Sequence, residues 1–192
     1  MKITKIELSH IAIPFAIPYR LSKTYGTLNE AHAVIIRIFT DEGIIGLGEA
    51  DPMSPFTAET PASVMAVTRD MITPHLIGQD PQRIAMVEAK LDDVVDGNLT
   101  ARGAVNMALY DIIGKVNDLP VHALLGGRRH SKLPLLFGVG SGTNEETIAV
   151  IQEQMESGCR CFMIKMGALP IADEIKRLIA VKDQFGDEIS II

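Results

Sequence analysis

One lysine stands out because of the apolar run that carries it. Residues 158–167 read GCRCFMIKMG and place Lys165 at the end of a predicted buried strand. An unpaired ammonium is costly in apolar surroundings, and catalytic groups of parallel sheets gather at the carboxyl ends of strands. Lys165 is therefore a candidate catalytic base. The alternative is a lysine whose stem lies along the strand while its ammonium reaches solvent.

A glycine-rich stretch, GVGSG at residues 138–142, follows a predicted strand and precedes a predicted helix. This is the context of a dinucleotide-binding loop, but the third glycine comes one residue early for the G-x-G-x-x-G spacing. Lys165 also occupies the strand end where an acidic residue would bind ribose. A dinucleotide-dependent enzyme is therefore the weaker alternative, and a loop at the mouth of a barrel is favoured.

Histidines and cysteines give weaker signals. No two histidines have metal-ligand spacing, so structural or surface roles are predicted for all five. Cys159 and Cys161 are too close in sequence for a good disulfide and are interpreted as reduced thiols, which favours a cytoplasmic protein.

Charge and hydropathy exclude two classes of partner. The 192 residues carry a formal net charge of −6, which argues against a general nucleic-acid binder. No apolar run has the length of a membrane span, and the N-terminus alternates like a strand and does not resemble a signal peptide. We expect neither nucleic acid nor a membrane as a partner.

The pattern of predicted strands and helices divides the chain into two parts. Residues 2–15, 31–40 and 44–49 predict a three-stranded antiparallel meander with a long loop at 16–30, and residues 60–76, 80–95 and 100–117 predict helices. From residue 133, apolar strands alternate with helices, which indicates a parallel sheet covered by helices. We predict domains at 1–130 and 131–192, the second containing too few strands to be complete.

Four segments together resemble the enolase superfamily, in particular its muconate lactonizing and mandelate racemase branches. They are FTDEGIIGLGEADP (39–52), ARGAVNMALYDIIGKVNDLPVHALLGG (101–127), LPLLFGVGSG (133–142) and GCRCFMIKMG (158–167). The resemblance implies an α+β capping domain of a meander plus a helical bundle. The first strands of a TIM-type (β/α)7β barrel, incomplete in this chain, would follow it.

The resemblance also implies a reaction. Such enzymes use Mg²⁺ and abstract a proton alpha to the carboxylate of a small acid, as racemases or epimerases, cycloisomerases or dehydratases, and a homo-oligomer is expected. Lys165 matches the second lysine of the Lys-x-Lys motif, whereas Met163 replaces the first, so the neighbouring positive charge is missing. Gly138 stands where related enzymes often carry a polar residue.

Two loops, at residues 16–30 and 51–56, resemble the capping loops that close over substrate. They make Tyr19, Tyr25, Met53 and Phe56 candidate substrate contacts. The resemblance places the Mg²⁺ ligands beyond Ile192, and none is assigned within the chain. We therefore expect the 192-residue chain alone to be inactive. The alternative is a truncated protein that acts only in binding or oligomerisation.

Overall fold

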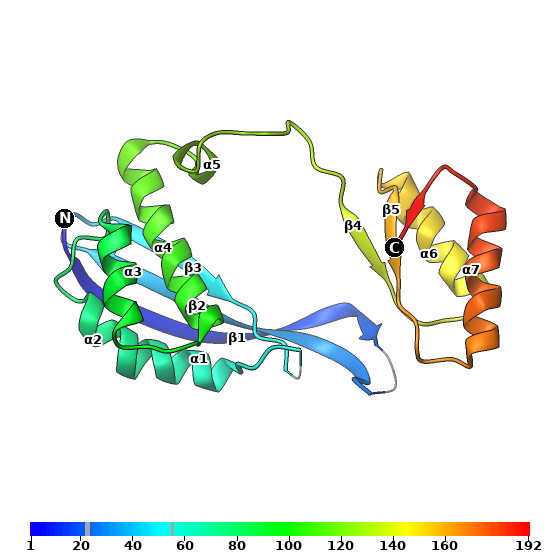
Figure 1. Ribbon diagram of the computed structural model, residues 1–192, viewed down its shortest axis with the longest axis horizontal. Coiled ribbons are helices and arrows are strands. Elements are labelled where there is room, and N and C mark those ends of the chain that lie inside the picture. Colours follow the sequence, from blue (N-terminus) through cyan, green and yellow to red (C-terminus); the bar gives the residue numbers. More distant parts are fainter. Residues whose placement is uncertain (22–23, 55) are drawn as a thin grey trace. The chain divides into compact units, whose positions relative to one another are not determined.

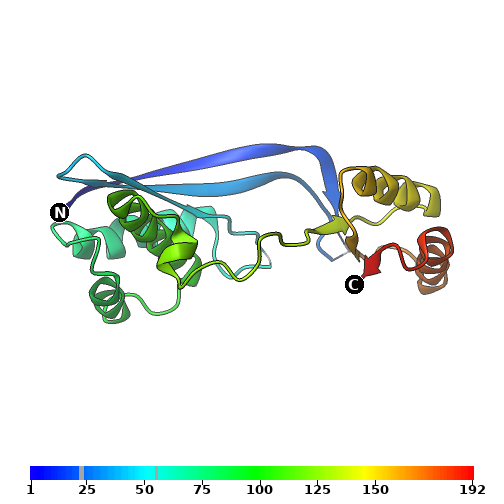
Figure 2. The same cartoon turned by 90° about the horizontal axis from the view of Figure 1, so that it is seen from above.

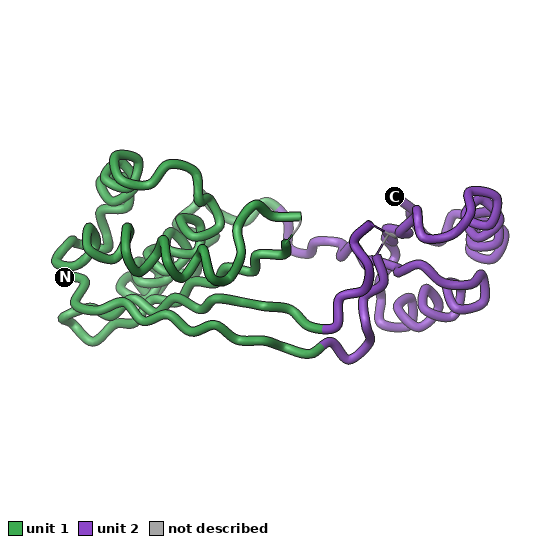
Figure 3. Tube along the Cα trace, turned by 90° about the horizontal axis from the view of Figure 1, so that it is seen from below, with its two compact units in different colours: residues 1–14, 30–129 green, residues 15–29, 130–192 purple. Residues whose placement is uncertain are grey.

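The computed structural model describes residues 1–21, 24–54 and 56–192, which form two compact units (Figure 3). Unit 1 contains Met1–Pro14 and Glu30–Arg129, and unit 2 contains Phe15–Asn29 and His130–Ile192. Residues 15–29 thus group with the C-terminal segment. The division into domains at 1–130 and 131–192 stays a prediction.

The N-terminal strands form the predicted three-stranded meander, with β1 (Ile3–Arg20), β2 (Thr27–Thr40) and β3 (Ile45–Ala50) in that order across the sheet (Figure 1). Strands β2 and β3 are antiparallel, with Val34 opposite Ala50 and Phe39 opposite Ile45.

The predicted loop at residues 16–30 is wrong in extent, because β1 and β2 continue into it. The backbone N–H of Leu21 donates to the carbonyl of Gly26 at 2.9 Å and closes a short turn between the strands. Pro18 is tolerated because β1 is an edge strand, where a missing ladder donor costs little.

Helices then cover one face of this sheet (Figure 2). They are α1 (Pro61–Val67), the π-helical turn η1 (Thr68–Ile72), α2 (Thr73–Leu76), α3 (Ile84–Asp92), α4 (Leu99–Asn117) and the short α5 (Val121–Leu124). The π-turn interrupts the single helix predicted over residues 60–76, next to Pro74, which has no N–H to donate. Helix α3 begins later than predicted, because Asp80 and Arg83 close a turn before it.

The core of unit 1 depends on a close approach between β3 and α4. A Cβ atom at Gly48 would collide with the carbonyl oxygen of Ala104, and one at Gly46 with the carbonyl oxygen of Ala108. The small side chains of Ala104 and Ala108 are fully buried there. Glycines facing alanines therefore allow the helix to lie directly on the strand.

Unit 2 contains a parallel sheet of β4 (Leu136–Val139), β5 (Cys161–Ile164) and β6 (Ser190–Ile191), in that order. Helices α6 (Asn144–Glu156) and α7 (Ile171–Phe185) follow β4 and β5. Phe162 and Ile164 of β5 pack with Ile151 of α6 and Val181 of α7 in a buried apolar cluster. These repeated strand–helix units are the start of a barrel, as the sequence predicted.

Within the ranges that the structure describes, no helix is long and apolar enough to cross a membrane.

Candidate active site

Lys165 directly follows β5, at the carboxyl end of the parallel sheet. Its backbone N–H donates to the carbonyl of Val139 at 2.9 Å, which joins it to the end of β4. Because Phe162 and Ile164 point into the helix-covered core, alternation places Lys165 and Met163 on the opposite face. The Lys165 side chain is half-buried, and no described residue bonds to its Nζ.

Tyr19, near the end of β1, lies against the first parallel strand. A Cβ atom at Gly138 would lie only 2.7 Å from the Tyr19 Oη, so the phenol takes the space that a side chain would need. Gly138 is the register partner of Met163, two residues before Lys165. Burial raises the pKa of the Tyr19 phenol, which therefore stays a protonated hydrogen-bond donor well above neutral pH.

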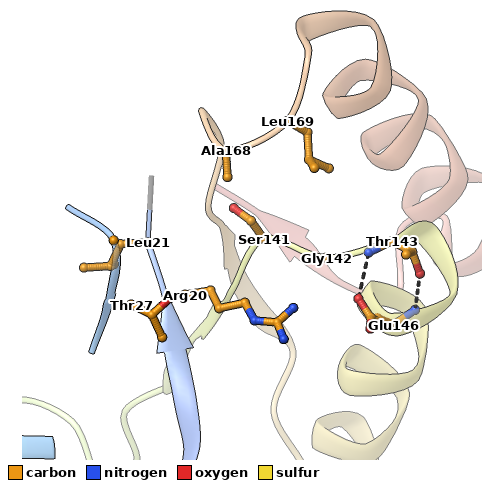
Figure 4. A pocket seen from close by; sticks show the side chains of 10 residues that line it. Arg20, Leu21, Thr27, Ser141, Gly142, Thr143, Glu146, Ala168 and Leu169 are labelled. Carbon is orange, nitrogen blue, oxygen red and sulfur yellow. Dashed lines mark hydrogen bonds between the residues drawn. The ribbon is translucent and has the colours of Figure 1, made fainter. Parts of the chain in front are cut away.

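A cleft of about 540 Å³ opens beside these strand ends, wholly within unit 2 (Figure 4). Its walls come from the β1–β2 turn, from the loop between β4 and α6, and from the segment after β5; they include Arg20, Thr27, Ser141, Thr143, Glu146 and Leu169. Clefts at the carboxyl ends of parallel strands are the usual location of ligand sites in α/β proteins.

Arg20 supplies the positive charge in this cleft. Its side chain extends from the end of β1 toward the Thr143–Glu146 turn (Figure 4). Within the described ranges no hydrogen bond or ion pair joins the Arg20 guanidinium to another residue. Glu146, by contrast, is committed to capping α6, since its carboxylate accepts the Thr143 N–H at 2.9 Å while Thr143 Oγ1 accepts the Glu146 N–H at 3.2 Å.

The other predicted substrate contacts lie in two places. Tyr25 is in the β1–β2 turn of unit 2 and is 42% exposed. Met53 and Phe56 belong to unit 1, in the loop after β3, where the Phe56 N–H donates to the Met53 carbonyl at 2.8 Å. The substrate roles of Tyr19, Tyr25, Met53 and Phe56 stay predictions.

A buried ion pair behind the strand ends was missed by the sequence reasoning. Glu174 and Arg177 of α7 are joined at 2.7 Å, with side chains only 2% and 1% exposed. A signal for it exists, because both charges occupy the helix face that also carries the buried Val181 and Phe185. Charged residues within the apolar stripe of a helix indicate a specific buried contact.

Two histidines, His10 and His32, form a contact that the sequence did not predict. His10 Nε2 lies 3.1 Å from His32 Nδ1 across β1 and β2, and His32 Nε2 lies 3.2 Å from a Glu30 carboxylate oxygen. Sequence spacing could not reveal this cross-strand pair. No group of three or more His, Cys, Asp or Glu side chains that could hold a metal ion occurs in the described ranges. Cys159 and Cys161 are free thiols.

A helix-covered meander followed by parallel strand–helix units, with a lysine ending the second parallel strand, defines the capping-domain-plus-barrel class of the enolase superfamily. The comparisons agree. The family described as "Mandelate racemase / muconate lactonizing enzyme, N-terminal domain" matches residues 4–126, and the chain belongs to that family.

Several characterised proteins are similar over nearly the whole chain. The N-succinyl-L-Arg/Lys racemase of Bacillus cereus is 33% identical over 191 residues, and its crystal structure superposes with a TM-score of 0.92. The L-Ala-D/L-Glu epimerase of Bacillus subtilis is 32% identical over 194 residues. The muconate lactonizing enzyme of Pseudomonas fluorescens, complexed with muconolactone, is 32% identical over 99% of this chain, with a TM-score of 0.93.

The chain spans about half the length of these relatives: 51% of the racemase and of the epimerase, and 52% of the lactonizing enzyme chain. These relatives are a racemase, an epimerase and a lactonizing enzyme.

Proposed function

We propose that the full-length protein carrying this chain abstracts the proton alpha to the carboxylate of a small acid, as a Mg²⁺-dependent racemase or epimerase, cycloisomerase or dehydratase. The observation that carries the proposal is Lys165, half-buried at the carboxyl end of β5 on the face that the helices leave open. The relatives act on an N-succinyl amino acid, a dipeptide and muconate, and each of these names denotes a small carboxylate.

In the proposed reaction Lys165 acts as the base. The neutral amine Nζ accepts the alpha proton and becomes an ammonium, while the electron pair of the broken C–H bond moves into the substrate carboxylate to give an enediolate. Return of a proton to the opposite face gives the epimer. In a dehydratase, the enediolate electron pair instead expels a leaving group from the beta carbon. In a cycloisomerase, a carboxylate oxygen of the substrate adds to the carbon–carbon double bond to give the enediolate, and the Lys165 ammonium then donates its proton to the alpha carbon.

Met163 limits how Lys165 can be activated. It stands on the same strand face, where the family motif has its first lysine, and brings no charge. Nearby, Arg177 donates to the Lys165 backbone carbonyl, but its charge is balanced by Glu174. We therefore assign no activating charge to Lys165 among these residues.

For substrate recognition we propose the cleft and the hydroxyl beside it. The Arg20 guanidinium would pair with an anionic group of the substrate, since a charge-assisted contact is the strongest that the cleft walls offer. The Tyr19 phenol would donate a hydrogen bond near Gly138 and so supply the polar group that this strand end lacks. Tyr25, Met53 and Phe56 stay proposed substrate contacts.

The described residues do not fit a Mg²⁺ site, because no three candidate ligands gather among them. We propose that its ligands come from outside this chain. The inactivity of the 192-residue chain by itself, a homo-oligomeric state and a cytoplasmic location stay predictions.

The test is solvent exchange at the alpha carbon. The full-length protein with Mg²⁺ in D₂O would be offered N-succinyl-arginine, L-Ala-L-Glu and muconate, with deuterium incorporation and product formation followed by NMR. We expect turnover of at least one acid, and a loss of about 1,000-fold or more in Lys165→Gln. Lys132→Gln, which removes an exposed lysine of the same unit, is the matched control. Full activity in Lys165→Gln would remove this lysine from the reaction.

A further inference from the structure

The buried Glu174–Arg177 pair touches more than its own helix. Arg177 donates through Nη2 to the backbone carbonyl of Lys165, and through Nη1 to the carbonyl of Gly140 at 3.3 Å. One guanidinium thus holds the carboxyl ends of both β4 and β5. These carbonyls lie past the last ladder bonds of their strands, where the backbone would otherwise be free to move.

Glu174 holds the segment that follows. Its Oε1 accepts the N–H of Gly167 at 3.0 Å and the N–H of Leu169 at 3.1 Å, while its Oε2 accepts from Arg177 at 2.7 Å. Leu169 lines the cleft, as does Ser141, which follows Gly140. A single ion pair therefore fixes two walls of the cleft and the backbone that carries Lys165.

The chemistry of the two side chains suits this task. A planar guanidinium with five donors can reach two carbonyls and a carboxylate at once, which an ammonium cannot do in one fixed geometry. The charges cancel within the pair, so it acts on Lys165 through geometry and not through a net field. A buried ion pair is also weak evidence for stability by itself, because apolar replacements are often neutral. Its bonds to four backbone groups suggest a different reason for its presence.

We propose that Glu174 and Arg177 are positioning residues, which clamp the ends of β4 and β5 so that Lys165 and the cleft walls keep one fixed arrangement. The part of this proposal that concerns catalysis rests on the function proposed above for Lys165. The clamp itself does not depend on that function, and the two can fail separately.

The decisive variant is the double replacement Glu174→Leu/Arg177→Met in the full-length protein, because it removes every clamp bond and leaves no unpaired buried charge. Arg177→Lys keeps the positive charge, but its single ammonium group replaces the two guanidinium nitrogens that bond the carbonyls of Gly140 and Lys165. The matched control is Asp173→Asn/Lys176→Gln, which removes an exposed ion pair of the same i, i+3 spacing on the same helix, with N···O at 3.1 Å.

The first measurement is amide hydrogen exchange by mass spectrometry, which needs no activity. In the double variant we expect exchange at residues 165–169 to be at least tenfold faster than in the unmodified protein, with α4 unchanged as an internal reference. The control variant should leave residues 165–169 as they are. Unchanged exchange there in the double variant would overturn the clamp.

The second measurement separates positioning from stability. On an acid that the unmodified protein turns over, we expect kcat to fall more than tenfold in the double variant while KM changes less than threefold. The kcat of Arg177→Lys should lie between that of the double variant and that of the unmodified protein. Faster exchange with unchanged kcat would overturn the role in positioning Lys165. If the unmodified protein turns over none of the acids, the proposed function fails, and hydrogen exchange still decides whether the clamp exists.

Discussion

The Tyr19 hydroxyl occupies the space above Gly138, where a Cβ atom would lie 2.7 Å from the phenol oxygen. Residue 138 is thus a glycine because a side chain from β1 takes its place. The hydroxyl comes from a tyrosine more than a hundred residues earlier in the chain, and we propose that it supplies the polar group that this strand end lacks.

This relationship predicts the effect of Gly138→Ala. The new methyl group would displace the Tyr19 hydroxyl, which is the far end of a flexible side chain, so the free energy of unfolding should change by less than about 1 kcal/mol. The displaced phenol should lower kcat/KM about tenfold. Steady-state kinetics with Tyr19→Phe and the double variant check this, because Gly138→Ala should cost little once the hydroxyl is gone. Additive losses would contradict the contact.

The raised pKa of Tyr19 predicts its titration and its effect on stability. Burial makes the folded protein hold this phenol proton to a higher pH than the unfolded chain does. Tyr19 therefore contributes stability that is fully present below the unfolded pKa of about 10 and is lost as the pH rises through the folded pKa. Phenolate absorbance of the unmodified protein minus that of Tyr19→Phe should show one phenol that titrates at a higher pH than an exposed tyrosine does. A difference curve with its midpoint at the ordinary tyrosine pKa of about 10 would refute burial of the phenol.

Replacement of Arg20 should weaken the binding of substrate. Arg20→Gln should raise KM for a carboxylate substrate roughly 10- to 100-fold, the usual value of a charge-assisted hydrogen bond, with kcat nearly unchanged. Arg83→Gln makes the same chemical change at an exposed arginine of unit 1 and should leave KM as it is. Equal KM values for Arg20→Gln and the unmodified protein would remove Arg20 from substrate recognition.

Local periodicity predicted the strand that ends at Lys165 and helix α7 because apolar spacing is a property of neighbouring residues. The contact between Tyr19 and Gly138, and that between Arg177 and Gly140, join segments far apart in sequence, and no spacing rule contains them. The Glu174–Arg177 pair could have been predicted from the sequence, since both charged residues lie in the apolar stripe of a helix. The first two strands were predicted to end at residue 15 and to begin at residue 31, whereas β1 and β2 continue to Arg20 and from Thr27; Pro18 is accommodated because β1 is an edge strand.

Packing of β3 on α4 predicts opposite effects for two glycines. Gly48→Ala would place a methyl group against the Ala104 backbone, which cannot yield, and should lower the free energy of unfolding by about 2–3 kcal/mol. Gly103→Ala, within α4 itself, meets no described atom within 4 Å of the new Cβ and should raise it by about 0.5–1 kcal/mol through helix propensity. Urea unfolding of the two variants measures both. Equal effects would mean that β3 and α4 do not pack this closely.

Helix α4 is capped from a distance, which predicts a role for Glu59. Asn98 precedes the helix in a left-handed conformation and its side chain makes no capping bond. The Glu59 carboxylate accepts the N–H of Thr100 at 2.7 Å and that of Ala101 at 3.0 Å instead. Glu59→Gln loses the charge and at least one acceptor, so the free energy of unfolding should fall by about 1–2 kcal/mol. Glu153→Gln, at an exposed position of α6, should change it by less than about 0.5 kcal/mol. If the two variants unfold at the same urea concentration, the first turn of α4 is stabilised by its packing against β3 and not by this carboxylate.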